Sequence, residues 1–111
     1  MARDLRHGDV RLYRFARPDK ERPVLVMTRQ SALAFLTRVT VAPISTTVRG
    51  APTELVLDVA DGMKTRCAVN LDHLITVPRA SLGRWLTTLD GRRMRETCAA
   101  LAFAVGCDRA S

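Results

Sequence analysis

Short strand-like segments separated by polar turns follow one another through the first two thirds of this chain. They are rich in aliphatic and β-branched side chains, and they are residues 9–15, 23–27, 38–44, 53–58, 66–70 and 73–77. Polar turns are predicted at residues 17–21, at 45–52 and at Asp61-Gly62, and Pro43 predicts an edge or a bulge in its strand. So many short strands favour a strongly bent sheet or a small barrel.

The last third of the chain changes to helical spacing. Apolar residues at positions 82, 85, 86 and 89 lie one turn apart, which predicts a helix with Trp85 in the core. Asp90 is the expected N-cap of a second helix that stops at Gly106. The apolar stripe of that helix is predicted to be Met94, Cys98, Leu101, Ala102 and Val105, with a solvated face at Arg92, Arg93 and Arg95.

A further short helix of one or two turns is predicted over residues 28–35, with Thr28 or Ser31 as its cap. The helices are few beside the strands, and 111 residues are typical of a single domain. The fold class expected is therefore mainly β with α, as one domain over residues 1–111. Because a chain of this size buries a modest core, a dimer interface would add stability.

The chain is basic, with 18 lysines and arginines against 11 acidic residues and a net charge of +7. Lys20 and Lys64 are the only lysines, so arginine carries most of the charge. The planar guanidinium suits two-point contacts with phosphate or carboxylate. This charge predicts either a nucleic acid or an acidic protein segment as partner, unless it serves only solubility.

The cysteines and histidines do not have the spacing of a zinc site. Cys67, Cys98 and Cys107 form no CxxC pair, and the two histidines lie far apart, so neither a metal nor another cofactor is expected. An odd cysteine count and a charged N-terminal segment predict a reducing cytoplasm. No apolar run reaches the length of a membrane span, so a membrane partner is not expected.

Four segments, in order and spacing over residues 8–107, resemble the MazF/PemK toxins of bacterial toxin–antitoxin systems. They are Gly8-Asp9-Val10; Arg22-Pro-Val-Leu-Val26; Val39-Thr-Val-Ala-Pro-Ile-Ser-Thr-Thr-Val-Arg-Gly50 with Pro52-Thr-Glu54; and Ala68-Val-Asn-Leu-Asp-His-Leu-Ile-Thr-Val77 before Leu82-Gly83. The resemblance implies an SH3-like barrel of the CcdB/MazF toxin type with a C-terminal helix. It also implies a cytoplasmic homodimer whose cognate MazE-like antitoxin covers the basic groove with an acidic tail.

The activity implied by the resemblance is a sequence-specific, metal-independent endoribonuclease. In such enzymes the ribose 2′-hydroxyl of single-stranded RNA attacks the adjacent phosphate and gives 2′,3′-cyclic phosphate and 5′-hydroxyl ends. The substrate supplies the nucleophile, so DNA is not a substrate. A guanidinium and a hydroxyl facing the phosphate would stabilise the charge of the transition state.

The family's functional positions are an arginine before the second strand and a threonine after the third. The resemblance places the arginine at Arg22 and the threonine at Ser45, where serine keeps the hydroxyl; Thr46 or Thr47 takes the role if the register shifts. The catalytic set expected is thus Arg22, Ser45 and Thr46. The RNA-binding set is Thr47, Arg49, Asn70, Asp72 and His73.

Alternatives remain open at several positions. His73 could act as a general base because histidine changes charge near neutral pH, or it could be an ordinary surface residue. Residues 45–47 could do no more than bond their own loop. The same fold also serves CcdB-like toxins that bind gyrase without RNA chemistry, and a disabled serine would leave an RNA-binding module without catalysis.

Overall fold

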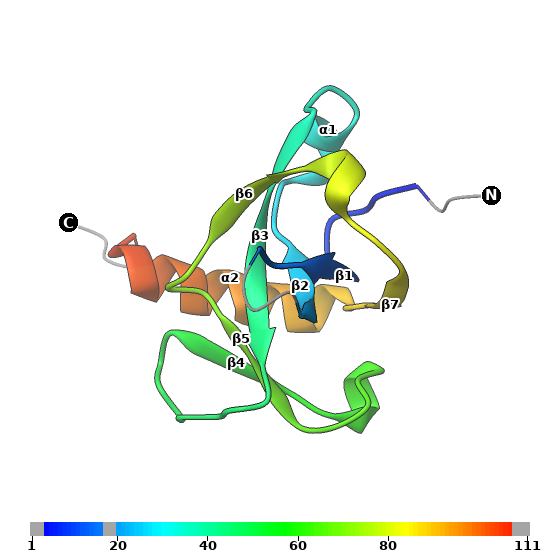
Figure 1. Cartoon of the computed structure of the whole chain (residues 1–111). Coiled ribbons are helices and arrows are strands. Elements are labelled where there is room, and N and C mark those ends of the chain that lie inside the picture. The colour runs from blue at the N-terminus through cyan, green and yellow to red at the C-terminus, as the bar shows by residue number, and fades with distance from the viewer. Residues whose placement is uncertain (1–3, 17–19, 108–111) are drawn as a thin grey trace.

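The computed structural model describes residues 4–16 and 20–107, and the turn predicted at residues 17–21 falls largely outside them. Its strands are β1 Asp9–Arg14, β2 Glu21–Val26, β3 Arg38–Ser45, β4 Glu54–Leu57, β5 Cys67–Asn70, β6 Ile75–Pro78 and β7 Trp85–Thr88. The helices are α1 Gln30–Leu33 and α2 Gly91–Val105, with the single 3₁₀ turns η1 Val59–Asp61 and η2 Arg79–Ser81. The strands form one curled sheet in the order β4-β5-β3-β2-β1-β7, with β6 on β3 (Figure 1).

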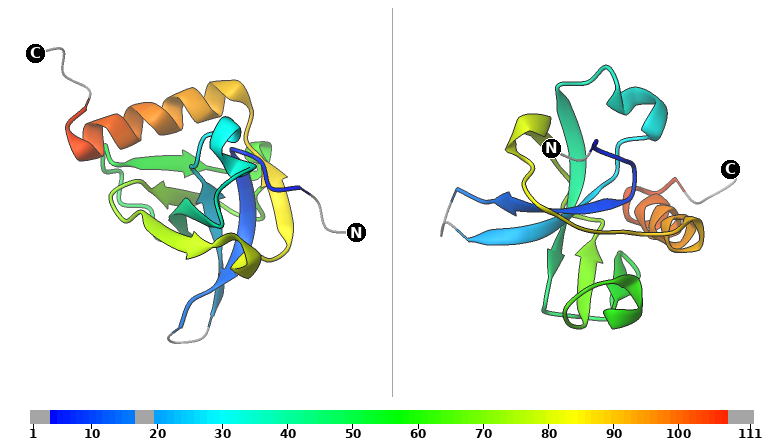
Figure 2. Two further views of the ribbon diagram at one scale, coloured as in Figure 1. Left: turned by 90° about the horizontal axis from the view of Figure 1, so that it is seen from above. Right: turned by 90° about the vertical axis from the view of Figure 1, so that its right-hand side faces the viewer.

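The expected fold, mainly sheet with a C-terminal helix, is confirmed. Helix α2 lies along one side of the curled sheet, and the β1–β2 hairpin extends away from it (Figure 2). The sheet curls because β3 changes partner: it pairs with β6 from Arg38 to Val41 and with β5 from Ile44 onward. Pro43 lies between these two ladders, and on the other side of β3 it is paired with Val24 of β2. It is thus at an interruption inside a central strand and not on an edge strand.

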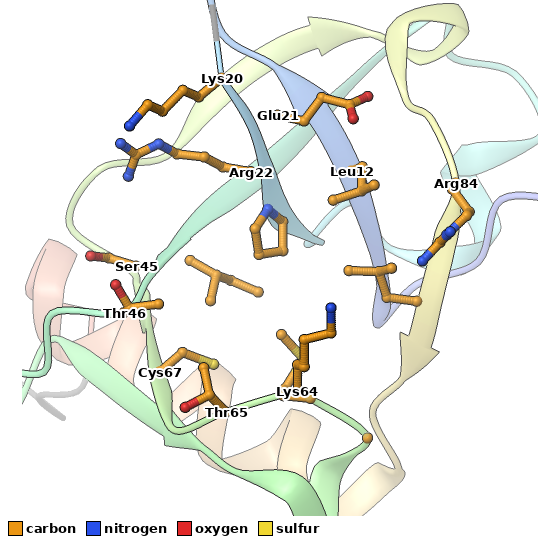
Figure 3. A pocket seen from close by; sticks show the side chains of 15 residues that line it. Leu12, Lys20, Glu21, Arg22, Ser45, Thr46, Lys64, Thr65, Cys67 and Arg84 are labelled. Atoms are coloured by element: carbon orange, nitrogen blue, oxygen red, sulfur yellow. The ribbon is translucent and has the colours of Figure 1, made fainter. Parts of the chain in front are cut away.

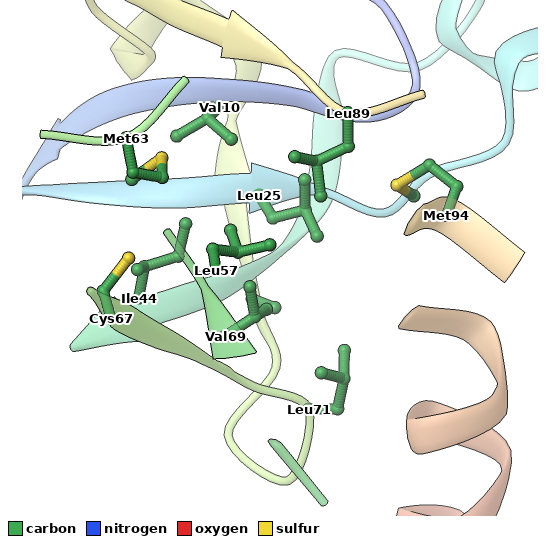
Figure 4. Packing of buried hydrophobic residues seen from close by; sticks show 11 residues of the cluster. Val10, Leu25, Ile44, Leu57, Met63, Cys67, Val69, Leu71, Leu89 and Met94 are labelled. Carbon is green, nitrogen blue, oxygen red and sulfur yellow. The ribbon is translucent and has the colours of Figure 1, made fainter. Parts of the chain in front are cut away.

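Apolar residues cover both faces of the sheet. Along β2, Leu25 faces one cluster while Val24 and Val26 face the other, because successive side chains alternate. The first cluster lies inside the curl of the sheet, on the side that α2 covers. It is made of Val10, Leu25, Ala42, Ile44, Leu57, Met63, Cys67, Val69, Leu71, Leu89 and Met94 (Figure 4). The second is made of Leu5, Val24, Val26, Leu33, Val39, Val41 and Val77. Two-sided burial explains why β2 is apolar without alternation.

The helix predicted from the spacing of residues 82–89 is wrong. Residues 85–88 form β7, which pairs with β1 through Asp9 and Thr88 and through Val10 and Thr87. Two adjacent β-branched threonines favour a strand, and the backbone N–H groups of this segment find partners on β1, which the local spacing could not show. Trp85 is 37% exposed and not in the core; its Nε1 donates to the Thr88 hydroxyl at 2.8 Å.

Helix α2 has the ends that the sequence predicts. The Asp90 side chain accepts a hydrogen bond from the Arg93 N–H, and Gly106 ends the helix in the left-handed conformation with φ 77°. The predicted stripe is wrong in part, because Met94 and Thr97 are buried while Cys98 and Val105 are exposed. Thr97 can be buried because its hydroxyl donates to the Arg93 carbonyl oxygen within the helix. At α1 the residue at the cap is Arg29, without a side-chain bond, so both predicted caps are wrong.

Arg93 does not belong to the solvated face that was predicted for the helix. Its guanidinium is 15% exposed and donates to both carboxylate oxygens of Asp61, at 2.8 and 3.1 Å, and to the Val56 carbonyl oxygen. Arg92, one residue earlier, is exposed and pairs only with Glu96. Arg93 therefore ties α2 to β4 and to η1.

Gly62 is expected to be the least replaceable of the turn glycines. Its φ is 93°, and a Cβ there would overlap the Thr87 side chain. Gly62→Ala is expected to lower the free energy of unfolding by about 2 kcal/mol, since backbone strain and overpacking add. Gly50→Ala is the matched control: φ is 76° but no atom lies within 4 Å, so about 1 kcal/mol is expected. Urea unfolding measures both, and equal losses would contradict the steric argument.

Candidate active site

A cleft of about 770 Å³ opens beside the β1–β2 hairpin (Figure 3). Four segments wall it: the β1–β2 hairpin, the end of β3, the chain between η1 and β5, and the chain at the start of β7. Its lining residues are Leu12, Lys20, Glu21, Arg22, Pro23, Ile44, Ser45, Thr46, Gly62, Met63, Lys64, Thr65, Cys67, Arg84 and Leu86. Arg22, Ser45 and Thr46, which are distant in sequence, therefore share one cavity.

Arg22 and Ser45 lie just beyond the end of the β2–β3 ladder, at positions that would face each other if its register continued. The β2–β3 ladder pairs Val26 with Val41 and Val24 with Pro43, and two further residues along each strand are Arg22 and Ser45. Residues opposite each other in an antiparallel pair project from the same face of the sheet. In Figure 3 the Arg22 guanidinium and the Ser45 hydroxyl extend to the same side of the cleft. The paired ladder stops at Val24, so the space between Arg22 and Ser45 is open.

The hydroxyl of Ser45 is oriented by its own loop. Its oxygen accepts a hydrogen bond from the Thr47 N–H at 3.0 Å, which leaves its hydrogen available for donation. Glu54 holds the rest of that loop, because one carboxylate oxygen accepts from the N–H groups of Arg49 and Gly50 at 3.1 and 3.0 Å. The loop that follows β3 is thus built to present Ser45 in a defined direction.

The remaining expected site residues lie at different places. Asn70 is 8% exposed and lines a smaller hollow of about 270 Å³ beside Arg22 and Ser45. Asp72 and His73 are exposed at the turn between β5 and β6, 3.8 Å apart between Oδ1 and Nδ1, and line neither cavity. The exposed side chains of Thr47 and Arg49 also lie outside both linings.

The chain is similar to known proteins. The sequence model of the family described as PemK-like, MazF-like toxin of type II toxin–antitoxin system matches residues 6–105. The chain belongs to this family. A Mycobacterium tuberculosis protein named endoribonuclease MazF3 is 43% identical over 91 residues, which cover 82% of this chain and 84% of that protein. The prediction that the chain is an endoribonuclease is thus confirmed by the name of this relative.

Solved structures agree with the family. The Mycobacterium tuberculosis toxin MazF-mt6 is 36% identical and superposes with a TM-score of 0.82 over 91% of this chain and 99% of that one. A mycobacterial endoribonuclease solved in complex with its cognate antitoxin gives a TM-score of 0.83 over 92% and 95% of the two chains. At 24% identity, that second likeness shows the fold alone.

Sequence reasoning missed most of the cleft of this MazF-like toxin, since only Arg22, Ser45 and Thr46 of its lining residues were expected. Lys64 and Thr65 reach it from the chain after η1, Arg84 from the chain before β7, and Lys20 from the hairpin. One signal was present in the sequence, since Lys20 and Lys64 are the only lysines of an arginine-rich chain. Both line the same cavity, which their separation in the sequence could not indicate.

The cleft of the toxin carries cations that lack acidic partners. Within residues 4–16 and 20–107, no ion pair involves Lys20, Arg22, Lys64 or Arg84, whereas Arg11, Arg92 and Arg93 are each paired with a carboxylate. Glu21 is the one acidic lining residue, and Figure 3 shows its carboxylate turned away from Lys20 and Arg22. A polyanion entering the cleft therefore meets positive charge that no described carboxylate neutralises.

The floor of the cleft is apolar and holds a thiol. Burial raises the pKa of the Cys67 thiol, and the negative charges of Asp58 and Asp61 raise it further, so this cysteine stays protonated near neutral pH. No three His, Cys, Asp or Glu side chains gather as metal ligands in the described part of the chain. Nor is any helix there long and apolar enough to cross a membrane.

Proposed function

We propose that this toxin is a sequence-specific endoribonuclease that cleaves single-stranded RNA through attack of the 2′-hydroxyl on the adjacent phosphate. The observation that supports it most directly is that Arg22 and Ser45 line the same open cleft, whose described cations lack acidic partners. Its membership of the toxin family and the endoribonuclease name of a 43% identical relative support the same reaction class over gyrase binding.

In the proposed step, the 2′-oxygen forms a bond to phosphorus as the bond from phosphorus to the 5′-oxygen breaks. The 2′-hydroxyl proton passes to solvent, and the departing 5′-oxygen takes up a proton. Negative charge grows on the non-bridging oxygens between these events. The Arg22 guanidinium can contact two of them, and the Ser45 or Thr46 hydroxyl can donate to one. Since the RNA supplies the nucleophile, these residues need only stabilise charge and hold geometry.

The partners proposed follow from the same cleft. A cognate antitoxin with an acidic tail would meet the cations that RNA meets, so the two ligands compete. The family to which the chain belongs is described as toxins of type II toxin–antitoxin systems, which supports this pairing. The proposed active form is a cytoplasmic homodimer of one-domain chains, residues 1–111.

Purified protein is expected to cleave RNA in the presence of EDTA and to leave 2′,3′-cyclic phosphate and 5′-hydroxyl ends. The 5′ ends should accept label from polynucleotide kinase without prior phosphatase treatment, and sequencing of the ends would map the motif. An oligonucleotide with one deoxynucleotide at the mapped position is the matched control and should stay intact. Fragments with 5′-phosphate and 3′-hydroxyl ends would contradict the proposed reaction.

A further inference from the structure

Lys64 faces Arg22 from another wall of the cleft. Figure 3 shows its ammonium group directed into the cavity from the chain after η1, whereas Lys20 and Arg22 enter from β2 and the turn before it. Its side chain is exposed, and no described residue forms a hydrogen bond or an ion pair with it. A cation in this position is free to bind an incoming anion.

The turn just before Lys64 is held by several hydrogen bonds. Asp58 and Asp61 bond each other's backbone as a capping box around η1, and Gly62 turns the chain in the left-handed conformation. The Thr87 hydroxyl donates to the Asp61 carbonyl oxygen at 3.1 Å, and Arg93 binds the Asp61 carboxylate. Lys64 therefore projects from a fixed turn, so little backbone ordering is lost when it binds a ligand.

Between the walls, the floor of the cleft is hydrophobic. Its members come from four strands and from the residue that precedes Lys64, and they are Leu12, Pro23, Ile44, Met63 and Leu86. An unpaired nucleobase can lay its face on such a surface, while the phosphates on either side of it need cations. Cations on both sides of an apolar floor match a single strand in which a base lies between two phosphates.

Building on the proposed function, we propose that Lys64 binds a phosphate next to the scissile one, so that the RNA strand crosses the apolar floor from Arg22 to Lys64. Lys64 makes this contact in the ground state and in the transition state alike, because the phosphate that it holds does not react. It is thus a substrate-binding residue that acts on KM, whereas Arg22 acts on kcat.

The test compares three variants of the full chain. Lys64→Ala is expected to raise KM for RNA cleavage about tenfold with kcat little changed, and Lys64→Arg should restore most of the loss because it keeps the charge. Arg95→Ala is the matched control, since it removes the same charge from the exposed surface of α2. It should leave both constants unchanged, which separates a local contact from the effect of net charge.

Binding to a 2′-O-methylated RNA oligonucleotide of mixed sequence tests the same contact without cleavage. The plot of log Kobs against log salt has a negative slope. In Lys64→Ala this slope is expected to become less steep by about 0.7, the value for one lost phosphate contact with a single strand. In Arg95→Ala it should not change. A wild-type slope in Lys64→Ala would overturn the proposal, even where the wild type cleaves RNA as proposed. So would unchanged RNA binding with weaker binding of polyglutamate, which would assign Lys64 to an acidic protein partner.

Discussion

Arg22→Ala is expected to lower kcat for RNA cleavage by about 10²–10³-fold, because the charge on the transition state loses the donor that faces it. Stability should change by less than about 0.5 kcal/mol, since the side chain is exposed and no described residue bonds to it. Arg22→Lys keeps the positive charge but loses the planar two-point contact, so an intermediate rate is expected. Single-turnover cleavage of one mapped oligonucleotide measures all three rates.

The hydroxyl arm of the site provides the comparison for Arg22. Ser45→Ala removes both the donor to the phosphate and the acceptor of the Thr47 N–H, whereas Ser45→Thr keeps both. If Ser45 carries the role, Ser45→Ala slows cleavage and Thr46→Ala does not. The reverse order would assign the role to Thr46. Full activity in Arg22→Ala would remove Arg22 from the mechanism whatever the hydroxyl variants do.

Arg93→Ala is expected to lower the free energy of unfolding by about 3 kcal/mol, because it breaks a largely buried ion pair. The change leaves the Asp61 carboxylate, 12% exposed, without its cation and removes the bond to the Val56 carbonyl oxygen. Arg92→Ala is the matched control one residue away: its ion pair with Glu96 is exposed, and a loss below about 0.5 kcal/mol is expected. Urea denaturation at neutral pH measures the two variants side by side.

The stabilisation by Arg93 should depend on pH in acid. Burial alone would raise the pKa of Asp61. Hydrogen bonds from Arg93 and from the Asp58 N–H, together with the charges of Arg93 and Arg92, outweigh burial and hold that pKa below its ordinary value. The unfolded state thus binds this proton first, and the stabilisation is complete above the unfolded pKa of about 3.9. It is lost as pH falls through the lower folded pKa, so wild type and Arg93→Ala should converge there. A constant difference down to that pH would exclude Asp61 as the partner that matters.

The same ion pair connects the core to the proposed RNA cleft. Asp61 anchors the turn from which Lys64 projects, and Arg93 anchors Asp61 from the helix on the other side of the sheet's edge. Arg93 is for this reason a positioning residue as well as a stabilising one. These contacts with Asp61 and Val56 explain why Arg93, unlike its neighbours Arg92 and Arg95, is largely buried.

Local signals in the sequence determined the elements whose causes are local. Valine-rich runs predicted β2 and β3, Asp90 and Gly106 predicted both ends of α2, and Asp61-Gly62 predicted its turn, because side chain and backbone chemistry within a few residues decides each of them. The resemblance to the toxins predicted Arg22 and Ser45 as site residues, and the structure brings both into one cleft.

Only the tertiary structure decided the features that depend on distant partners. Residues 85–88 have helical spacing but form a strand, because β1 supplies the hydrogen bonds. Arg93 is largely buried because Asp61 lies beside it, 32 positions away in the chain, and Lys64 and Arg22 line one cavity although they are distant in sequence. Backbone pairing, burial and the grouping of charges depend on which residues the fold brings together. The local sequence does not show which distant residues those are.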